Sequence, residues 1–281
     1  MRHNRRTFLT ALAGLPFAAR ACGAPVLNDY RANGVCDLNA ALRDGPVTLL
    51  AETYECLPAK VPPYAVVQGI PNKSRLLFDG QSPAFMPADR SRPCDLVTLF
   101  GFDVVAAGPG NAHALYLPSC RHWDVSRMTI DGWGGAAVMI YGQRENGLVA
   151  PSDATKCEFE HIRALRCGSG FVLTGTPDTP RIRGGASNMH TLTHCLASDC
   201  EGDGFAILQG SANRLDHCIA GQCRNGFVLA WYGNVLDQPI FERNREWGIY
   251  ETNHDEARQN SIRDPWNGGA NGGGVRRNPN G

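Results

Sequence analysis

The chain has 281 residues, 43% of them hydrophobic, with 27 basic and 27 acidic side chains. A neutral chain of this length can bury a sizeable core, but it has no surplus of positive charge for nucleic acid or acidic membranes. We therefore expect no nucleic-acid partner. The 32 glycines and 18 prolines favour many tight turns between short strands over long helices.

Residues 1–24 have the composition of an export signal. Asn4 to Thr10 reads NRRTFLT and is followed by a weakly apolar run to Ala19. This stretch resembles a twin-arginine signal, although its first and last residues depart from that pattern, and the run is too short to span a bilayer. We expect cleavage after Ala21 or Ala24 and a periplasmic or secreted protein without a transmembrane segment. A Sec signal and a basic cytoplasmic start are the alternatives, and lipid anchoring at Cys22 is not expected because an arginine stands where a small residue is needed.

Residues 25–46 are expected to form an N-terminal cap. Asp37 precedes an apolar stretch from Leu38 to Leu42 and is suited to begin a short helix that ends near Gly45. Beyond it, short apolar runs bounded by turn residues predict strands. These runs are Val47 to Tyr54, Ala65 to Phe78, Asp95 to Val105 and His113 to Leu117.

The clearest pattern is a repeat of short apolar runs. Two segments of the chain align position by position. The first contains Leu192, Cys195, Ala197, Cys200, Phe205 and Ile207, and the second contains Leu215, Cys218, Ala220, Cys223, Phe227 and Leu229. Earlier copies run from Val125 to Met139 and from Phe159 to Leu173, and a degenerate copy, which matches the pattern less well, runs from Leu236 to Ile249. Each copy is too small to bury its own apolar face, so the copies must stack and share one core.

This repeat resembles the right-handed parallel β-helix of the pectin-lyase-like superfamily. The resemblance implies an all-β fold in which residues 47–251 form one solenoid of about eight coils, with the short helix plugging its N-terminal end. Past Tyr250 the pattern stops, and we expect residues 252–281 to be a flexible tail rich in Gly and Asn. The fold by itself carries no catalytic signature.

Ten cysteines follow Cys22, and export would place them in an oxidising compartment. Cys36 with Cys56 and Cys94 with Cys120 are the disulfides we expect, although sequence does not fix the pairing. The cysteines of the repeat stack in columns and are expected to be buried thiols. A metal site is not expected from them, because no CxxC spacing is present.

One bend of the repeat carries polar side chains in register: Arg127, His161, His194, His217 and Gln238. Three histidines in a column suggest metal ligands. In the resembled fold, however, this bend often holds a ladder of asparagines that bond the backbone of the next coil, and a neutral imidazole can do similar work. We therefore expect a structural ladder here and no metal site.

The strand that holds Phe171, Phe205 and Phe227 corresponds to the sheet on whose outer face members of the superfamily bind polysaccharide. We expect the outward side chains of this strand to be Val138, Val172, Ala206 and Val228. None is a carboxylate, so neither the acids of calcium-dependent lyases nor the paired aspartates of hydrolases can be placed here. A calcium requirement stays open.

The turn that enters this sheet carries charged side chains in adjacent coils. If the protein is an enzyme, we expect Asp199, Glu201 and Asp203 to act as acid, base or cation ligands and Arg224 to stabilise charge. The same four side chains would serve equally as salt bridges on a solvated edge.

Two insertions follow the phenylalanine strand, at Tyr141 to Lys156 and at Thr174 to Ser187. Loops stacked on one side of a solenoid would wall a groove for an extended chain, unless they only decorate the surface. The side chains expected to contact substrate are Tyr141, Arg144, Arg181, Arg183, Trp231 and Tyr232. The sequence thus predicts an exported polysaccharide-binding β-helix protein, acting as a polysaccharide lyase or glycoside hydrolase on an acidic glycan. The alternative is a non-catalytic carbohydrate-binding or surface-structural solenoid.

Overall fold

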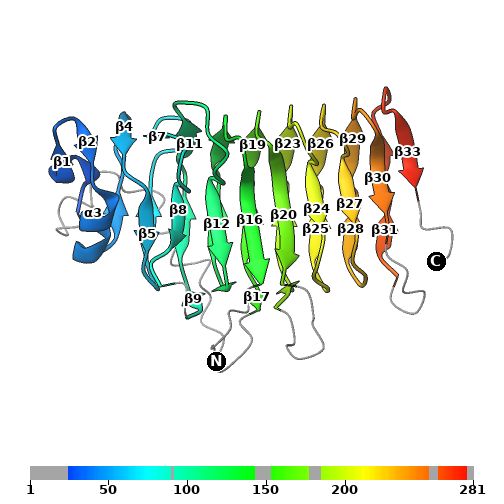
Figure 1. Cartoon of the computed structure of the whole chain (residues 1–281), viewed down its shortest axis with the longest axis horizontal. Helices are drawn as coiled ribbons and strands as arrows, with labels where there is room; N and C mark the ends of the chain where they lie inside the picture. The colour runs from blue at the N-terminus through cyan, green and yellow to red at the C-terminus, as the bar shows by residue number, and fades with distance from the viewer. Residues whose placement is uncertain (1–24, 90–91, 143–152, 177–184, 253–258, 277–281) are drawn as a thin grey trace.

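The computed structural model describes residues 25–89, 92–142, 153–176, 185–252 and 259–276. The expected fold class is confirmed: the chain winds into a parallel β-helix whose strands stack from one end of the molecule to the other (Figure 1). Three long sheets, named A, B and C below, run along the solenoid, and a short sheet D adds to them. Sheets A and C have nine strands each, so the described chain makes nine windings where about eight were expected.

The strands follow one another around the solenoid in a fixed order. Sheet A contains β3 (Val47–Thr48), β6 (Val66–Gln68), β10 (Thr98–Phe100), β14 (Asp124–Ser126), β18 (Glu158–Glu160), β22 (Thr191–Thr193), β25 (Arg214–Asp216), β28 (Val235–Asp237) and β31 (Ser261–Arg263). Sheet B contains β1 (Arg31–Ala32), β2 (Val35–Cys36), β4 (Thr53–Cys56), β7 (Arg75–Phe78), β11 (Asp103–Ala106), β15 (Thr129–Asp131), β19 (Arg163–Leu165), β23 (Leu196–Ser198), β26 (Ile219–Gly221), β29 (Ile240–Glu242) and β32 (Trp266–Asn267). Sheet C contains β5 (Ala59–Val61), β8 (Phe85–Pro87), β12 (Leu115–Pro118), β16 (Ala136–Gly142), β20 (Ser169–Gly175), β24 (Phe205–Ile207), β27 (Phe227–Leu229), β30 (Trp247–Glu251) and β33 (Gly273–Arg276). Sheet D contains β9 (Cys94–Asp95), β13 (Cys120–Arg121), β17 (Ala154–Thr155) and β21 (Ser187–Asn188).

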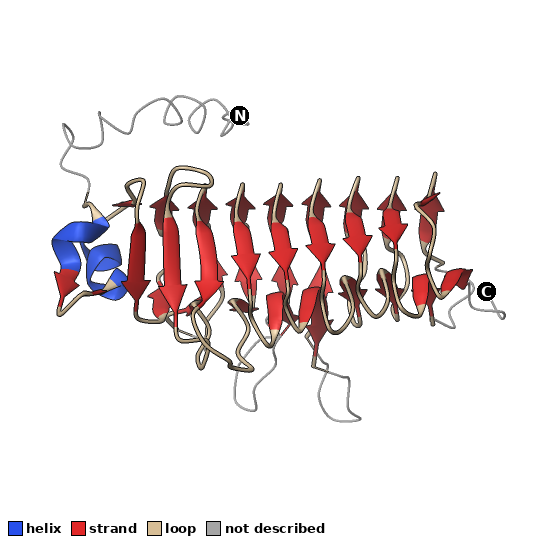
Figure 2. Ribbon diagram, turned by 90° about the horizontal axis from the view of Figure 1, so that it is seen from above, coloured by secondary structure: helices blue, strands red, loops and turns tan. Residues whose placement is uncertain are grey.

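A short helix closes the N-terminal end of the solenoid (Figure 2). Helix α3 (Leu38–Asp44) follows the 3₁₀ turn η1 (Leu27–Tyr30), and the Asp37 carboxylate accepts hydrogen bonds from the backbone nitrogens of Asn39 and Ala40 at 2.9 and 3.1 Å. These bonds satisfy two of the backbone donors that a helix start leaves free. Leu38, Ala41 and Leu42 are buried in the core that the helix covers. No helix among the described residues is long and apolar enough to cross a membrane.

Equivalent residues of successive windings share a column, as the repeat predicts. Phe171 pairs with Phe205, and Phe205 pairs with Phe227. Their rings are parallel, with centroids 4.8 and 5.0 Å apart, and all three side chains are buried. This spacing equals that of neighbouring strands, so the stack continues as long as the register holds.

The expected register was wrong in one copy. Val138, expected to face outward, pairs with Phe171 and is fully buried, and the outward side chain of β16 is Met139. The turn between Trp133 and β16 holds one residue more than the copy at Cys167 suggests, and a shift of one residue exchanges the two faces of a strand.

The expected flexible tail was also wrong for residues 261–276. Strands β31, β32 and β33 pair with β28, β29 and β30 and form a ninth winding. Ile262 and Val275 take the column positions of Leu236 and Ile249. The previous winding supplies the backbone partners, and because this is the last described winding Ile262 is only partly buried and Val275 remains 41% exposed.

A ladder of buried amides lies at the turn into sheet A. The Asn213 side-chain oxygen accepts from the His190 backbone N–H at 2.9 Å, and Asn234 and Asn260 repeat this contact one winding on, at 3.1 and 2.9 Å. A ladder of this kind was expected at the histidine bend, and that expectation was wrong: the amide ladder is formed by other residues at another turn. His161, His194 and His217 are instead exposed, with backbone φ of 51 to 55° and ring centroids 5.1 Å apart.

The ten described cysteines are buried free thiols. The expected disulfides Cys36–Cys56 and Cys94–Cys120 are therefore wrong, although each pair stands in register on neighbouring strands. Thiols of the repeat lie near a carbonyl oxygen of the preceding winding, as Cys218 does with Leu192 at 3.4 Å. They act as small packing residues with a weak donor, as the sequence predicts for the repeat.

Candidate functional site

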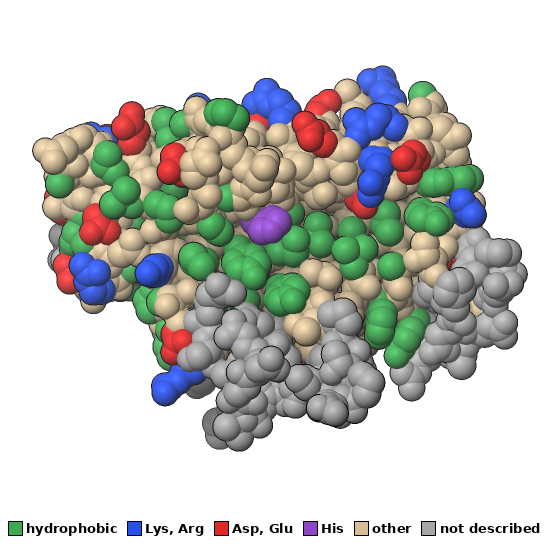
Figure 3. Space-filling view, in the orientation of Figure 1, with side chains coloured by type: hydrophobic (Ala, Val, Ile, Leu, Met, Phe, Trp, Pro, Cys, Tyr) green, Lys and Arg blue, Asp and Glu red, His purple; other side chains and the backbone are tan. Residues whose placement is uncertain are grey.

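One row of side chains crosses the outer face of sheet C at right angles to its strands. We call it the sheet C floor, and it consists of Lys60, Met86, Tyr116, Met139, Val172, Ala206, Val228, Tyr250 and Arg276. Only the two end positions are charged. Val172, Ala206 and Val228 form an apolar cluster outside the core, with Met139 and Tyr250 packed against it. Figure 3 shows hydrophobic side chains over this face, with charged side chains gathered mainly along one edge above it.

Aromatic side chains accompany the C-terminal half of the floor. The Arg276 guanidinium lies over the rings of Trp247 and Tyr250, at 5.5 and 5.2 Å from their centroids. Trp231 and Tyr232, which follow β27, stack with centroids 5.2 Å apart and are both half-buried. Flat rings on an open face provide surfaces on which sugar rings can stack.

Tyr141 lies at the end of β16, beside the floor, and its hydroxyl is 3.1 Å from the Thr176 hydroxyl of the next winding. Tyr141 was expected to contact substrate together with Trp231 and Tyr232. Tyr141 lies within β16, and Trp231 and Tyr232 follow β27, a strand of the same sheet at a later winding. The other three residues of that group, Arg144, Arg181 and Arg183, lie outside the described residues.

The charged turn that enters sheet C contains one tight ion pair. Arg224 donates from Nε and Nη2 to both carboxylate oxygens of Asp203 at 2.9 to 3.1 Å, and Asn225 Nδ2 donates to the same carboxylate at 2.9 Å. Asp203 is 9% exposed. Its hydrogen bonds raise the pKa of the Arg224 guanidinium. Three donor atoms therefore fix the position of this carboxylate.

The other two predicted acids are not brought to this pair. Asp199 and Glu201 are both exposed, and Asp199 accepts from its neighbour Ser198 at 2.8 Å. Arg245 donates to the Glu201 backbone carbonyl, which ties the turn to a later winding. Within the described residues, no hydrogen bond links Asp199 or Glu201 to Asp203.

We expect Asp203→Ala to lower the free energy of unfolding by about 2 kcal/mol, because it leaves Arg224 and the buried Asn225 amide without their shared acceptor. The matched change Glu201→Ala removes an exposed carboxylate and is expected to stay within about 0.5 kcal/mol of the parent. Urea unfolding followed by circular dichroism measures both. Equal effects of the two changes would contradict a structural role for Asp203.

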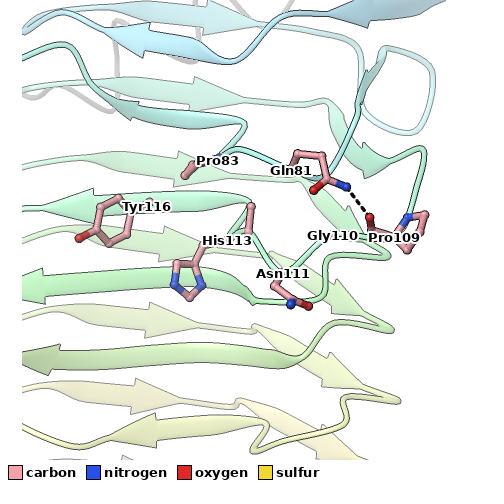
Figure 4. A pocket seen from close by; sticks show the side chains of 8 residues that line it. Gln81, Pro83, Pro109, Gly110, Asn111, His113 and Tyr116 are labelled. Atoms are coloured by element: carbon pink, nitrogen blue, oxygen red, sulfur yellow. Dashed lines mark hydrogen bonds between the residues drawn. The ribbon is translucent and has the colours of Figure 1, made fainter.

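A hollow opens near the N-terminal half of the floor, where the chain enters β8 and β12. Its lining consists of Gln81, Pro83, Pro109, Gly110, Asn111, Ala112, His113 and Tyr116 (Figure 4). The rings of His113 and Tyr116 lie nearly parallel, with centroids 5.7 Å apart. His113 Nδ1 accepts a hydrogen bond from the Ala136 backbone N–H at 2.9 Å. The neutral ring therefore carries its proton on Nε2.

Burial lowers the pKa of His113 from the ordinary value of 6.5. Because the unfolded chain then binds this proton more readily than the folded one, stability is lost as the pH falls from about 6.5 towards the folded-state pKa. We expect the melting temperature of the protein to fall more between pH 7.5 and 5.0 than that of His113→Gln, which has no ring to protonate. Identical losses in both proteins would contradict this assignment.

The sequence does not single out His113 and Tyr116, because they precede the first regular copy of the repeat. They stand three positions apart, and a continuous strand would place them on opposite faces. Their rings meet only because His113 lies in the bend before β12, which begins at Leu115. No group of three or more His, Cys, Asp or Glu side chains within the described ranges is arranged to hold a metal ion, the histidine column included.

The sequence was compared with models of known protein families and with curated proteins. The family model described as "Right handed beta helix region" matches residues 113–278. A sequence search of curated proteins finds no match to this chain.

Several solved structures are similar in fold. The catalytic domain of a GH87 alpha-1,3-glucanase in complex with tetrasaccharides superposes with a TM-score of 0.55 at 12% identity, over 78% of this chain and 40% of that chain. The mannuronan C-5 epimerase AlgE4 A-module of Azotobacter vinelandii gives a TM-score of 0.42 at 12% identity, over 90% of this chain and 96% of that one. The tailspike protein of Acinetobacter baumannii phage AM24 gives 0.42 at 10% identity, over 89% and 55%.

At these identities the structural likenesses concern the fold alone, and the chain spans 40% of the glucanase domain chain that it matches. The family model, in contrast, covers more than half of the sequence, and its match includes the repeat, most of the sheet C floor and the ninth winding. The chain therefore belongs to the family of right-handed β-helix regions.

Proposed function

We propose that the protein is exported by the twin-arginine-type signal at residues 1–24 and binds a polysaccharide along the sheet C floor. The observation that carries this proposal is the floor itself: one outward row, without a charged side chain between Lys60 and Arg276, repeated at every winding. The windings are spaced by about 4.8 Å, close to the length of one sugar ring, so a glycan lying along the axis meets a similar surface at each unit.

The chemistry of the floor supports a sugar ligand. Tyr116, beside the His113 ring, and Tyr250, beneath the Arg276 guanidinium, supply aromatic groups for the apolar side of a pyranose. Val172, Ala206 and Val228, with Met139 packed against them, form the apolar surface between the two tyrosines. The fold comparison adds support, because a domain of similar fold is known with tetrasaccharides bound. The ion pair of Asp203 supports binding over catalysis, since that carboxylate is occupied.

A polysaccharide lyase or glycoside hydrolase acting on an acidic glycan is the second candidate. It is favoured by Arg224, whose side chain stays 50% exposed while it holds Asp203 and so presents positive charge beside sheet C. The exposed carboxylates of Asp199 and Glu201 lie on the same edge and would supply the acid or base.

A panel of neutral and uronate-containing glycans, titrated into the purified protein by calorimetry, tests the proposal. We expect at least one glycan to bind, and Tyr250→Ala to weaken it about tenfold by removing a stacking face worth about 1.4 kcal/mol. Tyr64→Ala, which removes a 70% exposed tyrosine away from the floor, is expected to leave affinity unchanged. Equal losses in both variants, or no bound glycan, would contradict the proposal.

Cleavage is tested on the same panel with and without calcium, by the absorbance of unsaturated products and by reducing ends. Product formation that disappears in Glu201→Gln would favour the second candidate. Binding without any product favours the non-catalytic solenoid.

A further inference from the structure

We infer that the hollow lined by Gln81, Asn111, His113 and Tyr116 is a binding subsite for an uncharged pyranose unit. This inference rests on the proposed function, because Tyr116 also belongs to the sheet C floor and the hollow opens onto it. It adds the position of one sugar unit and its chemical class.

The described lining of the hollow offers no positive charge to an anionic ligand. None of its eight residues is Asp, Glu, Lys or Arg. His113 is held neutral by the bond from the Ala136 N–H to Nδ1. The carboxylate of Asp79, in the loop beside the hollow, accepts from the Gln81 backbone N–H at 3.0 Å and would repel an anion. A uronate or sulfated sugar would therefore be desolvated here without a counter-charge.

The polar atoms of the hollow match the hydroxyl groups of a sugar. The neutral His113 ring directs its Nε2 proton away from Ala136, as a donor. The exposed Asn111 side chain offers both an amide donor and a carbonyl acceptor. Gln81 uses Nε2 to hold the Pro109 carbonyl at 2.6 Å, which leaves its side-chain oxygen as an acceptor. A hydroxyl group both donates and accepts, so paired donors and acceptors select it over a purely apolar ligand.

The rings supply the apolar half of the site. His113 and Tyr116 lie nearly parallel, at 23° and 5.7 Å between centroids, and are both half-buried. In Figure 4 the two rings lie side by side, with Asn111 beside His113 and Gln81 across the hollow. A pyranose stacked on these rings would place its edge hydroxyls towards the amide groups.

The backbone holds this arrangement before any ligand arrives. A Cβ on Gly110 would lie 1.9 Å from the Gly80 carbonyl oxygen, so the loops of two windings touch directly. The bond from Gln81 to Pro109 joins the same two loops. Pro83 and Pro109 restrict the backbone further, and a preformed site loses less conformational entropy on binding.

Methionine methyl NMR of the whole protein tests the inference, with a neutral α-1,3-linked glucose tetrasaccharide and a mannuronate tetrasaccharide as probes. Met86 and Met139 flank Tyr116 in the floor, while Met189 is 46% exposed outside sheet C and serves as the control. We expect the neutral probe to shift the Met86 and Met139 signals and to leave Met189 unchanged. The mannuronate probe should not shift Met86.

Variants then separate the hollow from the rest of the floor. Tyr116→Ala is expected to lower the affinity for the neutral probe at least tenfold, and Asn111→Ala is expected to lower it about threefold. Tyr116→Phe keeps the ring and is expected to bind the probe as tightly as the parent protein does. Circular dichroism melting checks that each variant is folded.

The outcomes distinguish this inference from the proposed function. The neutral probe could bind with an affinity that Tyr250→Ala lowers and Tyr116→Ala leaves unchanged. That result would overturn the subsite and leave binding along the floor in place. A mannuronate probe that shifts Met86 as strongly as the neutral one would overturn the uncharged class. If neither probe binds and no glycan of the wider panel binds, both the subsite and the proposed function are wrong.

Discussion

Phe205→Ala is expected to lower the free energy of unfolding by about 4 kcal/mol. The Phe205 ring lies between those of Phe171 and Phe227, parallel to both, and is 1% exposed. Its removal leaves a cavity that the two neighbours cannot fill, because their strands are fixed by pairing on both sides. Urea unfolding followed by circular dichroism measures the change.

Leu208→Ala is the control for this substitution. Leu208 follows Phe205 in the same winding but is 42% exposed, so its truncation should alter stability by no more than about 0.5 kcal/mol. A loss below 1 kcal/mol for Phe205→Ala would mean that the rings do not form a continuous buried stack.

Gly168→Ala is expected to lower the free energy of unfolding by about 3 kcal/mol. A Cβ at this position would lie 2.0 Å from the Gly134 carbonyl oxygen and 3.0 Å from that of Gly135. Both atoms belong to the backbone of the preceding winding, so the two windings must separate to admit a methyl group. The same close approach recurs at Gly110 and Gly134.

Gly221→Ala provides the matched control. The atom nearest to a Cβ there is Cγ of Glu242 at 3.6 Å, an ordinary contact with a flexible side chain. This change is expected to be neutral or to stabilise by about 0.5 kcal/mol, because alanine restricts the unfolded chain. Thermal unfolding of both variants decides the point, and equal melting temperatures would show that the windings are not in contact at Gly168.

Sequence predicted the solenoid because its repeat fixes which residues share a column. Phe171, Phe205 and Phe227 align through a pattern of six positions, and apolar burial leaves only one register for them. Val138 was placed on the wrong face because turns between strands vary by one residue, and nothing in the pattern marks which turn is longer.

The ninth winding could not be predicted from apolar residues. Ile262 and Val275 are isolated in sequence, and they become part of the solenoid only because β28 and β30 present open strand edges to the following chain. Pairing with an existing edge requires less apolar burial than starting a new sheet.

The candidate site was predicted in part. Contact between charged side chains of adjacent coils is present as the pair of Asp203 and Arg224. The hydrogen bond from Asn225 and the burial of Asp203 were not predicted, because sequence does not reveal burial of a turn residue. Tyr116 and Tyr250 lie 134 positions apart and share a row only through the stacking of the windings between them.

A crystal structure of the protein with the neutral tetrasaccharide tests the location of the binding surface most directly. We predict sugar density on the outer face of sheet C, along the axis of the solenoid, with one ring over His113 and Tyr116. Sugar bound instead at the exposed histidines of the opposite bend, His161, His194 and His217, with sheet C bare, would contradict the account.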